Sequence, residues 1–376
     1  MARIPADAVF DGHNDTLVAV RFPRPGEERS FLERSEHGHL DLPRAVEGGF
    51  GGGFFGICVP ADPTSRDPAE SDLLLTETGY ELPLPPPLDP AYARQMTVSV
   101  MANAFRLEAE SGGTVKIARS AREVASCLRR GVVAVVLHLE GADAIDPDLD
   151  ALRVFYAAGL RSLGIVWSRP NAFGTGVPFK FPGSPDTGPG LTECGRELVR
   201  ECNRLGVVLD LAHLNERGFR EVAALSDAPL VVTHAAAHAL CPSSRNLTDW
   251  QIDAVGESGG VIGVAFHVGF LRADGRPDAN TPLTEIVRHI DYIAGRIGIE
   301  HVAFGSDFDG AVMPLELADV TGLPKLIGAL RAHGYDEAAL RKVTHENWLR
   351  VLERAWKPSP SQGGHLGRRQ ANGKSL

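Results

Sequence analysis

VVLDLAHLNERGFREVAALSDAPLVVTH, residues 207–234, contains the pattern that decides the fold: an apolar run, an amphipathic stretch and a second apolar run. Continuous runs of Val, Leu and Ala, without strict alternation, are typical of parallel strands that are buried on both faces. Asn215 stands at the start of the amphipathic stretch 215–225 and has the chemistry of a helix N-cap. The segment therefore predicts a strand, a helix and a second strand parallel to the first.

The same alternation runs along most of the chain. Amphipathic stretches such as 193–205, 215–225 and 283–297 lie between short apolar runs. The eight apolar runs cover residues 9–15, 53–59, 132–140, 163–167, 207–213, 230–234, 261–266 and 302–307. Eight strand–helix alternations favour a closed (β/α)₈ TIM barrel, an α/β fold, over the alternative of a doubly wound open sheet.

Three longer segments interrupt the alternation. Residues 21–40, 60–90 and 171–190 are rich in Pro, Gly or charge, and we predict that they are loop insertions near the barrel mouth. The last of them has the composition of a lid. Residues 1–356 are predicted to form a single catalytic barrel domain, and residues 357–376 to be a disordered tail.

The bulk composition is that of a soluble globular protein, with 376 residues, 43% hydrophobic and 23% charged. The net charge of −10 and the lack of a basic stretch argue against nucleic acid as a partner. No apolar run approaches the length of a membrane span, and the first residues lack the apolar core of a secretion signal. Five scattered cysteines predict free thiols and a cytoplasmic location.

Histidines and carboxylates stand at the ends of the predicted strands. They are His13 and Asp15 in DGHND, Glu140 in VVLHLEG, His213 in VLDLAH, His234 in LVVTHA and Asp307 in AFGSDFDG. All strand C-termini of a barrel open on one face, so these side chains should converge. One histidine at a strand end is usually structural, and Asp15 could simply cap a helix. Six such residues at the same end predict a metal site.

The ligand types indicate which metal the site binds. Imidazole and carboxylate groups without thiolate suit zinc or another first-row divalent ion. His13 and Asp15, two residues apart on an extended strand, would reach one ion from the same face. His213 and His234 could share a second ion, with Glu140 as the bridge. Two ions about 3.5–4 Å apart would hold a bridging hydroxide and polarise a carbonyl, which is a hydrolytic arrangement.

Seven motifs occur in a characteristic order. They are DGHNDT, HLDLPRAVEGGFGGGFFGICVP, LEGADAI, GLRSLGIVW, DLAHLNERGF, VVTHAAAHAL followed by SRNLTDWQI, and GSDFDG. The series resembles the membrane (renal) dipeptidase family, peptidase family M19, over residues 11–350. The resemblance implies a metal-dependent hydrolase barrel with two Zn²⁺ per subunit, other divalent transition metals being possible. It also implies hydrolysis of free L-Xaa-L-Xaa and L-Xaa-D-Xaa dipeptides by a metal-bridging hydroxide, and a homodimer.

The resemblance also implies roles for individual residues. His13 and Asp15 would bind the first metal, Glu140 would bridge, and His213 with His234 would bind the second. Asp307 matches the acidic residue that carries a proton to the leaving amine, so Glu140 and Asp307 are the expected catalytic residues. Arg245, in SRNL, matches the arginine that binds the substrate. Its guanidinium can bind a carboxylate through two hydrogen bonds, which would select free dipeptides over longer chains.

Trp167 departs from the pattern of the family. Mammalian members have a histidine at this position, which is thought to bind substrate or to stabilise the tetrahedral oxyanion. Tryptophan cannot replace that histidine electrostatically. Either the metals alone stabilise the oxyanion, or a neighbour such as Arg169 or Asn171 contributes. Trp167 is therefore expected among the substrate-binding residues, and the substrate preference stays open.

Two other kinds of protein, besides a dipeptidase, could have histidines and carboxylates at the strand ends of a barrel. Another barrel metallohydrolase, such as a lactonase or a cyclic amidase, usually has His-Xaa-His on strand one and often a bridging lysine. This chain has His13-Asn14-Asp15 and Glu140 instead, which favours the dipeptidase. A non-catalytic binding protein on the same barrel would have lost a metal ligand, and all five are present.

Overall fold

A computed structural model describes residues 8–62, 73–76 and 78–356 of the chain. Parallel strands follow one another in the order β1-β2-β6-β7-β9-β10-β11-β12. Their bounds are β1 Val9–Asn14, β2 Phe50–Cys58, β6 Val133–Glu140, β7 Ser162–Gly164, β9 Val208–Asp210, β10 Val231–Ala235, β11 Val261–Val264 and β12 Val302–Phe304. Each predicted apolar run overlaps one of these strands. One further strand, β5 (Val115–Ile117), pairs with the start of β6 and was not predicted.

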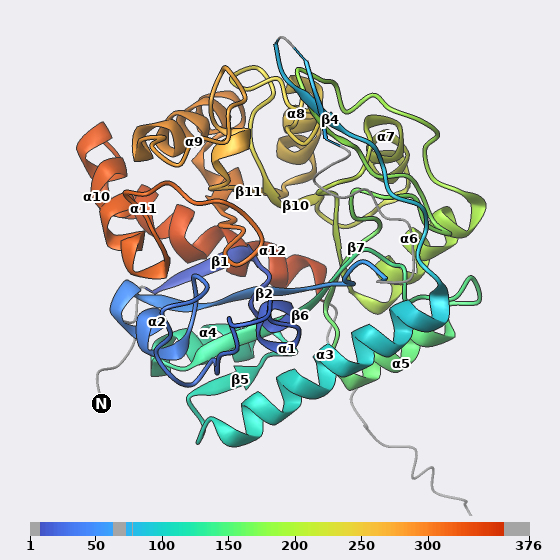
Figure 1. The fold of residues 1–376 in the computed structure, drawn as a ribbon, viewed down its shortest axis with the longest axis horizontal. Helices are drawn as coiled ribbons and strands as arrows, with labels where there is room; N and C mark the ends of the chain where they lie inside the picture. The colour runs from blue at the N-terminus through green and yellow to red at the C-terminus, as the bar shows by residue number, and fades with distance from the viewer. Residues whose placement is uncertain (1–7, 63–72, 77, 357–376) are drawn as a thin grey trace, which may run out of the picture.

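The barrel closes between its first and last strands. Asn14 and Phe308 form a parallel bridge just beyond β12. Two backbone hydrogen bonds reinforce it: Asp15 N donates to Phe308 O at 2.8 Å, and Asp307 N donates to His13 O at 3.0 Å. The fold is therefore a (β/α)₈ TIM barrel, as predicted (Figure 1).

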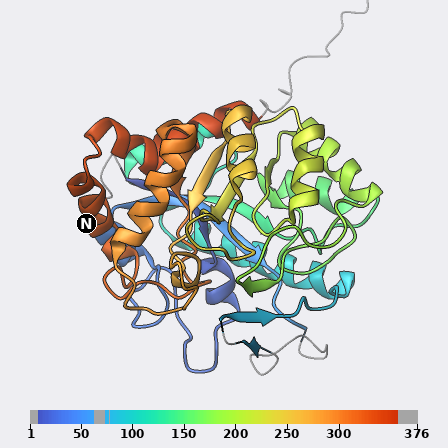
Figure 2. The same cartoon turned by 90° about the horizontal axis from the view of Figure 1, so that it is seen from above.

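Helices surround the strands and cover their outer faces (Figures 1 and 2). Their bounds are α1 Thr16–Arg21, α2 Leu42–Gly48, α3 Pro90–Glu110, α4 Ala121–Arg130, α5 Asp150–Ala158, α6 Glu193–Leu205, α7 Glu216–Leu225, α8 Asp249–Ser258, α9 Leu283–Ile297, α10 Leu323–His333, α11 Glu337–Arg341 and α12 Asn347–Ala355. Short 3₁₀ turns span Val268–Phe270, Ile299–His301 and Val320–Gly322, and a π-helical turn spans Lys342–Glu346. Asn215 caps α7 as predicted, because its side chain accepts a hydrogen bond from Gly218 N at 2.8 Å.

The core lies between the strands and the helices and also fills the barrel. Strands β1, β6 and β10 are buried along their whole length. Trp348 of α12 is fully buried, and its indole Nε1 donates to Phe304 O at 3.0 Å. A Cβ atom on Gly12 would lie 2.6 Å from the Trp348 ring, so only glycine allows β1 to pass this close.

A small antiparallel sheet lies beyond the carboxyl ends of the barrel strands (Figure 2). It consists of β3 (Leu74–Leu75), β4 (Tyr80–Leu82) and β8 (Phe179–Phe181). The loops predicted at 60–90 and 171–190 therefore pair with each other, which the sequence did not indicate. The reason is that a backbone ladder between distant segments leaves little trace in short, irregular stretches.

The remaining predictions about the chain have mixed outcomes. Residues 22–40 contain no helix or strand, as expected of a loop. All five cysteines are unpaired, as predicted. Within the described part of the chain, no helix combines the length and the apolar composition that crossing a bilayer requires. The predicted tail at 357–376 lies outside the described residues.

Candidate metal centre

The predicted site residues meet at the carboxyl end of the barrel. A cavity of about 100 Å³ is lined by Asp15, Glu140, Trp167, His213, His234, Arg245 and Asp307, together with residues that the sequence analysis did not single out. His13 is buried directly beside it, with its Nε2 3.6 Å from Asp15 Oδ1. The structure thus brings every predicted site residue together.

Glu140 occupies the centre of the cluster, as expected of a bridging ligand. It is the last residue of β6, and its Oε1 lies close to three imidazole nitrogens. The distances are 3.0 Å to His213 Nε2, 3.5 Å to His234 Nε2 and 3.7 Å to His13 Nε2. The Nε2 atoms of His213 and His234 are themselves 3.1 Å apart. One carboxylate therefore faces all three histidines.

Turns just past the strands, and not strand periodicity alone, orient three of the side chains. β1 ends at Asn14, so Asp15 is not on the strand; it stands at the N-cap of α1 without capping it through its side chain. The prediction that Asp15 lies on the same strand as His13, two residues along it, is therefore wrong. His213 and Asp307 follow β9 and β12 with φ of 64° and 65°, a region that non-glycine residues rarely occupy. Such backbone strain clusters at functional sites.

Two glycines leave the room that the cluster needs. A Cβ atom on Gly56 of β2 would lie 2.9 Å from both Asp15 Oδ1 and the His13 ring. A Cβ atom on Gly310 would lie 2.1 Å from Asp15 Oδ2 and 2.6 Å from Asp307 Oδ1. Any larger residue at either position would displace these carboxylates or the imidazole.

The donor set fits divalent metal ions. Among the described residues, two groups of three have ligand atoms within 4.8 Å of one another: His13 with Glu140 and His234, and His13 with Asp15 and Asp307. Both ring nitrogens of His13 and Asp15 Oδ1 are buried without a hydrogen-bond partner. Buried polar atoms without partners are costly, and coordination of a cation would satisfy them.

The carboxylates of the cluster draw positive charge toward His13, where a metal ion would take the place of the ring proton. Burial lowers the pKa of His13, but the carboxylates of Glu140 and Asp15 more than offset this effect and raise it to about 10. Burial raises the pKa of Glu140 to about 8, against the opposing charge of His13. Burial also lowers the pKa of His213 and His234 well below the usual range, so both rings are neutral, as metal ligands must be.

Hydroxyl groups orient two of the imidazoles from behind. Thr233 Oγ1 lies 2.6 Å from Asp210 Oδ2 and 2.9 Å from His234 Nδ1. Since the hydroxyl has one proton and donates it to the carboxylate, it accepts a hydrogen bond from Nδ1–H of His234. Nε2 then presents its lone pair to the cavity. Ser168 Oγ lies 2.8 Å from His213 Nδ1 and can act in the same way.

Arg245 brings a buried positive charge into the same cavity. It is 3% exposed, and its Nη2 makes a 3.5 Å hydrogen bond to His234 O. Its Nε has no hydrogen-bond partner. Burial lowers its pKa to about 10, with Asp307 and Glu140 opposing that shift, so the guanidinium stays charged at neutral pH. Such a group can bind an anion that enters the cavity.

Trp167 forms part of the cavity wall. Its ring centroid lies 5.8 Å from that of His213. Of the two neighbours predicted for the oxyanion, Arg169 lines an adjoining pocket and donates to Pro86 O at 3.3 Å. Asn171 Nδ2 donates to Ile165 O at 2.8 Å. Neither of them is among the described residues that line the inner cavity.

Five lining residues were not predicted from the sequence: His267, Phe270, Phe179, Gly310 and Ala311. His267 follows β11, so the rule of polar residues at strand ends could have found it. Phe270 packs under the Arg245 guanidinium, 5.4 Å from its Cζ. Phe179 comes from β8 and lies 5.6 Å from Trp167 between ring centroids. The two phenylalanines carried no signal, because an apolar residue in a loop has no distinctive pattern.

The fold and the site together define a metal-dependent hydrolase of the TIM-barrel class. The family profile described as membrane dipeptidase (Peptidase family M19) matches residues 4–361. The chain belongs to this family and is therefore a metallopeptidase of the dipeptidase type, as its motifs predicted. A metal cofactor follows from the same membership.

Individual relatives agree with this assignment. An uncharacterized protein in the pqqA 5′ region of Klebsiella pneumoniae is 52% identical over 252 residues, 67% of this chain and 93% of that protein. A metallo peptidase from Rhodobacter sphaeroides, liganded with a phosphinate mimic of the dipeptide L-Ala-D-Ala, is 52% identical. It superposes with a TM-score of 0.89 over 94% of this chain and 100% of that one. Dipeptidase AC, also a metallo peptidase, is 52% identical with a TM-score of 0.88 over 93% and 99%.

Proposed function

We propose that this protein is a binuclear zinc dipeptidase that hydrolyses free dipeptides, both L-Xaa-L-Xaa and L-Xaa-D-Xaa. The observation that carries the proposal is the buried guanidinium of Arg245 in the same small cavity as the histidine–carboxylate cluster. A positive charge beside a hydrolytic centre favours a substrate whose own negative charge lies next to the scissile bond. The C-terminal carboxylate of a dipeptide meets this requirement. The ligand of the Rhodobacter sphaeroides relative, a phosphinate mimic of L-Ala-D-Ala, supports L-Xaa-D-Xaa dipeptides as substrates.

Five residues would hold the two metal ions. His13 and Asp15 are assigned to one ion, His213 and His234 to the other, and Glu140 to both. Zinc fits this set of nitrogen and oxygen donors best, although manganese or cobalt would also fit. Bound at this position, two divalent ions supply an activated water and polarise the scissile carbonyl.

The residues of the chain bind the substrate and move the proton. Arg245 holds the C-terminal carboxylate through charge-assisted hydrogen bonds. Asp307 accepts the proton that the attacking water loses and delivers it to the nitrogen of the leaving amine as the C–N bond breaks. Burial raises the pKa of Asp307 to about 6, with His13 opposing, and two bound cations would lower it again, so the carboxylate is ionised and takes the proton of the attacking water only transiently. Trp167 excludes water on the side of His213.

The test compares L-Ala-L-Ala and L-Ala-D-Ala with their C-amidated and N-acetylated forms, together with metal analysis of the purified protein. We expect hydrolysis of the free dipeptides, about two ions per chain, and loss of activity on C-amidation. Arg245→Met should lower kcat/KM for free dipeptides about 10- to 100-fold, the range for a hydrogen bond to a charged group. Amidated substrates cleaved as fast as free ones would refute the role of Arg245.

A second variant tests the proton transfer. Asp307→Asn should retain its metal and lose about 10²- to 10⁴-fold in kcat, the usual range for general acid–base catalysis. Full activity of this variant would remove Asp307 from the mechanism.

The cellular setting belongs to the same proposal. Five unpaired cysteines favour a reducing compartment, so we place the protein in the cytoplasm. The homodimer that the family resemblance implies stays a prediction, as does the single domain over residues 1–356.

A further inference from the structure

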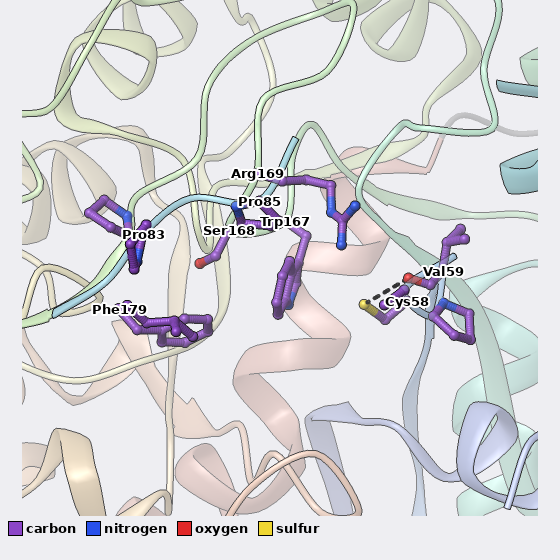
Figure 3. Close-up of a pocket in the computed structure, with 12 residues that line it drawn as sticks. Cys58, Val59, Pro83, Pro85, Trp167, Ser168, Arg169 and Phe179 are labelled. Atoms are coloured by element: carbon purple, nitrogen blue, oxygen red, sulfur yellow. Dashed lines mark hydrogen bonds between the residues drawn. The ribbon is translucent and has the colours of Figure 1, made fainter. Parts of the chain in front are cut away.

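A second pocket, of about 250 Å³, lies beside the inner cavity and has mostly apolar walls. Val59 and Pro60 follow β2, Leu82 and Pro83 come from β4 and its end, and Trp167 with Phe179 completes the wall. Figure 3 shows the Trp167 side chain projecting between Phe179 on one side and Cys58 with Val59 on the other. This apolar pocket is larger than the cavity of about 100 Å³ that contains the metal ligands.

The apolar pocket is continuous with the metal centre. Trp167 and Phe179 line both it and the inner cavity. A third and larger cavity, of about 890 Å³, is lined by Cys58, Pro60 and Trp167 and also by Asp15 and Glu140 of the metal cluster. A group bound at the cluster can therefore extend into the apolar pocket past the edge of Trp167.

The polar groups in the walls of this pocket are already engaged. Ser168 Oγ bonds to His213 Nδ1 at 2.8 Å. Arg169 donates to Pro86 O, its positive charge acts on the buried carboxyl of Asp143, and its Cζ lies 5.6 Å from the centroid of the Trp167 ring. The thiol of Cys58 lies 4.0 Å from Val59 O (Figure 3). A charged or amide side chain entering the pocket would lose water without gaining partners of its own, whereas an apolar side chain would gain from burial.

The position of the apolar pocket in the barrel assigns it to one end of a dipeptide. Arg245 follows β10, whereas Cys58 ends β2, and these two strands are four places apart in the ring of eight (Figure 1). With the C-terminal carboxylate at Arg245 and the scissile carbonyl at Glu140, the N-terminal residue points toward β2 and β7. Its side chain then lies beside Trp167.

From these observations we infer that the apolar pocket beside Trp167 binds the side chain of the N-terminal residue and selects dipeptides with a large apolar residue there. The inference rests on the proposed dipeptidase activity and adds the substrate class. Leu82 and Trp167 are its specificity-determining residues. Leu82 pairs with Phe179 across the β4–β8 ladder, so the small sheet forms one wall of the pocket.

The experiment measures kcat/KM for two series of L-dipeptides, Xaa-Ala and Ala-Xaa, with Xaa as Gly, Leu, Phe, Asp and Lys. In the wild-type protein we expect Leu-Ala and Phe-Ala to exceed Gly-Ala about tenfold or more, since a few buried methylene groups give this discrimination. A preference for Asp-Ala or Lys-Ala would overturn the inference. The inference would also be overturned if the Ala-Xaa series showed this preference for apolar residues and the Xaa-Ala series showed no preference.

Variants of Leu82 then locate the selection. Leu82→Trp should fill the pocket and lower kcat/KM about tenfold for Leu-Ala and Phe-Ala, with little change for Gly-Ala. Leu82→Ala should enlarge it and shift the optimum toward Phe-Ala relative to Leu-Ala. Leu75→Trp is the matched control, because Leu75 lies on β3 of the same sheet and is 79% exposed. Its profile should equal that of the wild type.

The outcomes separate this inference from the proposed function. Hydrolysis of no dipeptide by the metal-loaded wild type would refute the dipeptidase itself. Hydrolysis with a profile unchanged in both Leu82 variants would refute the pocket alone. Gly-Ala activity reports whether each variant has folded.

Discussion

At the scale of single residues, Thr233 links a buried carboxylate to a metal-ligand candidate without lining the cavity itself. Its hydroxyl joins Asp210 to His234, and Asp210 Oδ1 also accepts hydrogen bonds from the backbone nitrogens of Ala212 and Thr233. These contacts fix the position of the Asp210 carboxylate. The Thr233 hydroxyl therefore donates its proton to Asp210 and accepts a hydrogen bond from Nδ1–H of His234. Thr233 is thus a positioning residue that selects the tautomer of His234.

Replacement of Thr233 tests this relay. Thr233→Val keeps the shape but removes the hydroxyl, and we expect the affinity for the metal ion assigned to His213 and His234 to fall about 10- to 100-fold. Thr233→Ser should restore most of that affinity. The measurement is competition with a chromophoric chelator, which reports metal binding independently of activity.

A matched control is available in another buried threonine–histidine pair. Thr344 Oγ1 lies 3.1 Å from Nδ1 of His345, an imidazole that is not among the proposed ligands, and Thr344→Val makes the same substitution as Thr233→Val. Thr344→Val should therefore leave the metal affinity unchanged. An affinity in Thr233→Val equal to that of the wild type would show that the backbone alone orients His234.

At the scale of elements, the N-terminus of α7 anchors the loop predicted as a lid. Asn215 Oδ1 caps the helix, and its Nδ2 donates to Pro189 O at 2.7 Å and also to Thr187 O. One amide side chain therefore ties the segment 171–190, which carries Phe179, to the scaffold. A cap and a loop anchor are combined in a single residue.

Two substitutions of Asn215 separate these roles. Asn215→Ser keeps an oxygen for the cap but cannot reach the loop carbonyls, while Asn215→Ala loses both. We expect Asn215→Ala to lower the free energy of unfolding by about 1 kcal/mol more than Asn215→Ser. Both variants should be cleaved faster within residues 171–190 in limited proteolysis.

Helix α4 supplies the control for this prediction. Ser120 caps it by accepting from Glu123 N at 3.3 Å, and this cap lies far along the chain from the 171–190 segment. Ser120→Ala should lower the stability without changing cleavage of that segment. Equal protection of residues 171–190 in the wild type and in Asn215→Ser would contradict the anchoring role.

At the scale of the whole molecule, metal binding and stability are coupled. The proposed ligands stand on strands or in the turns just after them, from His13 on β1 to His234 on β10, and they meet only in the folded state. The carboxylates of the cluster repel one another when no cation lies between them. Any ion that binds only the folded form adds to its stability by mass action.

Removal of the metal should therefore destabilise the protein. With free ion at about 1,000 times its Kd, a chelator should lower the free energy of unfolding by about 4 kcal/mol. Urea unfolding with and without chelator, with metal content measured in parallel, gives this difference. In Glu140→Gln the chelator effect should shrink, because the central carboxylate is lost. Unchanged stability after complete removal of the metal would contradict the coupling.

Local patterns predicted most of the fold and of the site. Each strand has its own apolar run, and the histidine or carboxylate at its end is fixed relative to that run by covalent spacing. For this reason Glu140, His213 and His234 could be identified with no knowledge of the neighbouring strands. The barrel then follows from alternation, because parallel strands with intervening helices have few ways to bury both faces.

The sequence by itself thus determined the barrel, the family, the residues that meet at the candidate metal centre and the positive charge of Arg245. Only the tertiary structure decided how Asp15 reaches His13 from the N-cap of α1, and that Thr233 connects Asp210 to His234. It alone paired β4 with β8 and placed Leu82 beside Trp167. The physical reason is that these contacts join segments far apart in the chain, through side-chain packing and hydrogen bonds that no local pattern records.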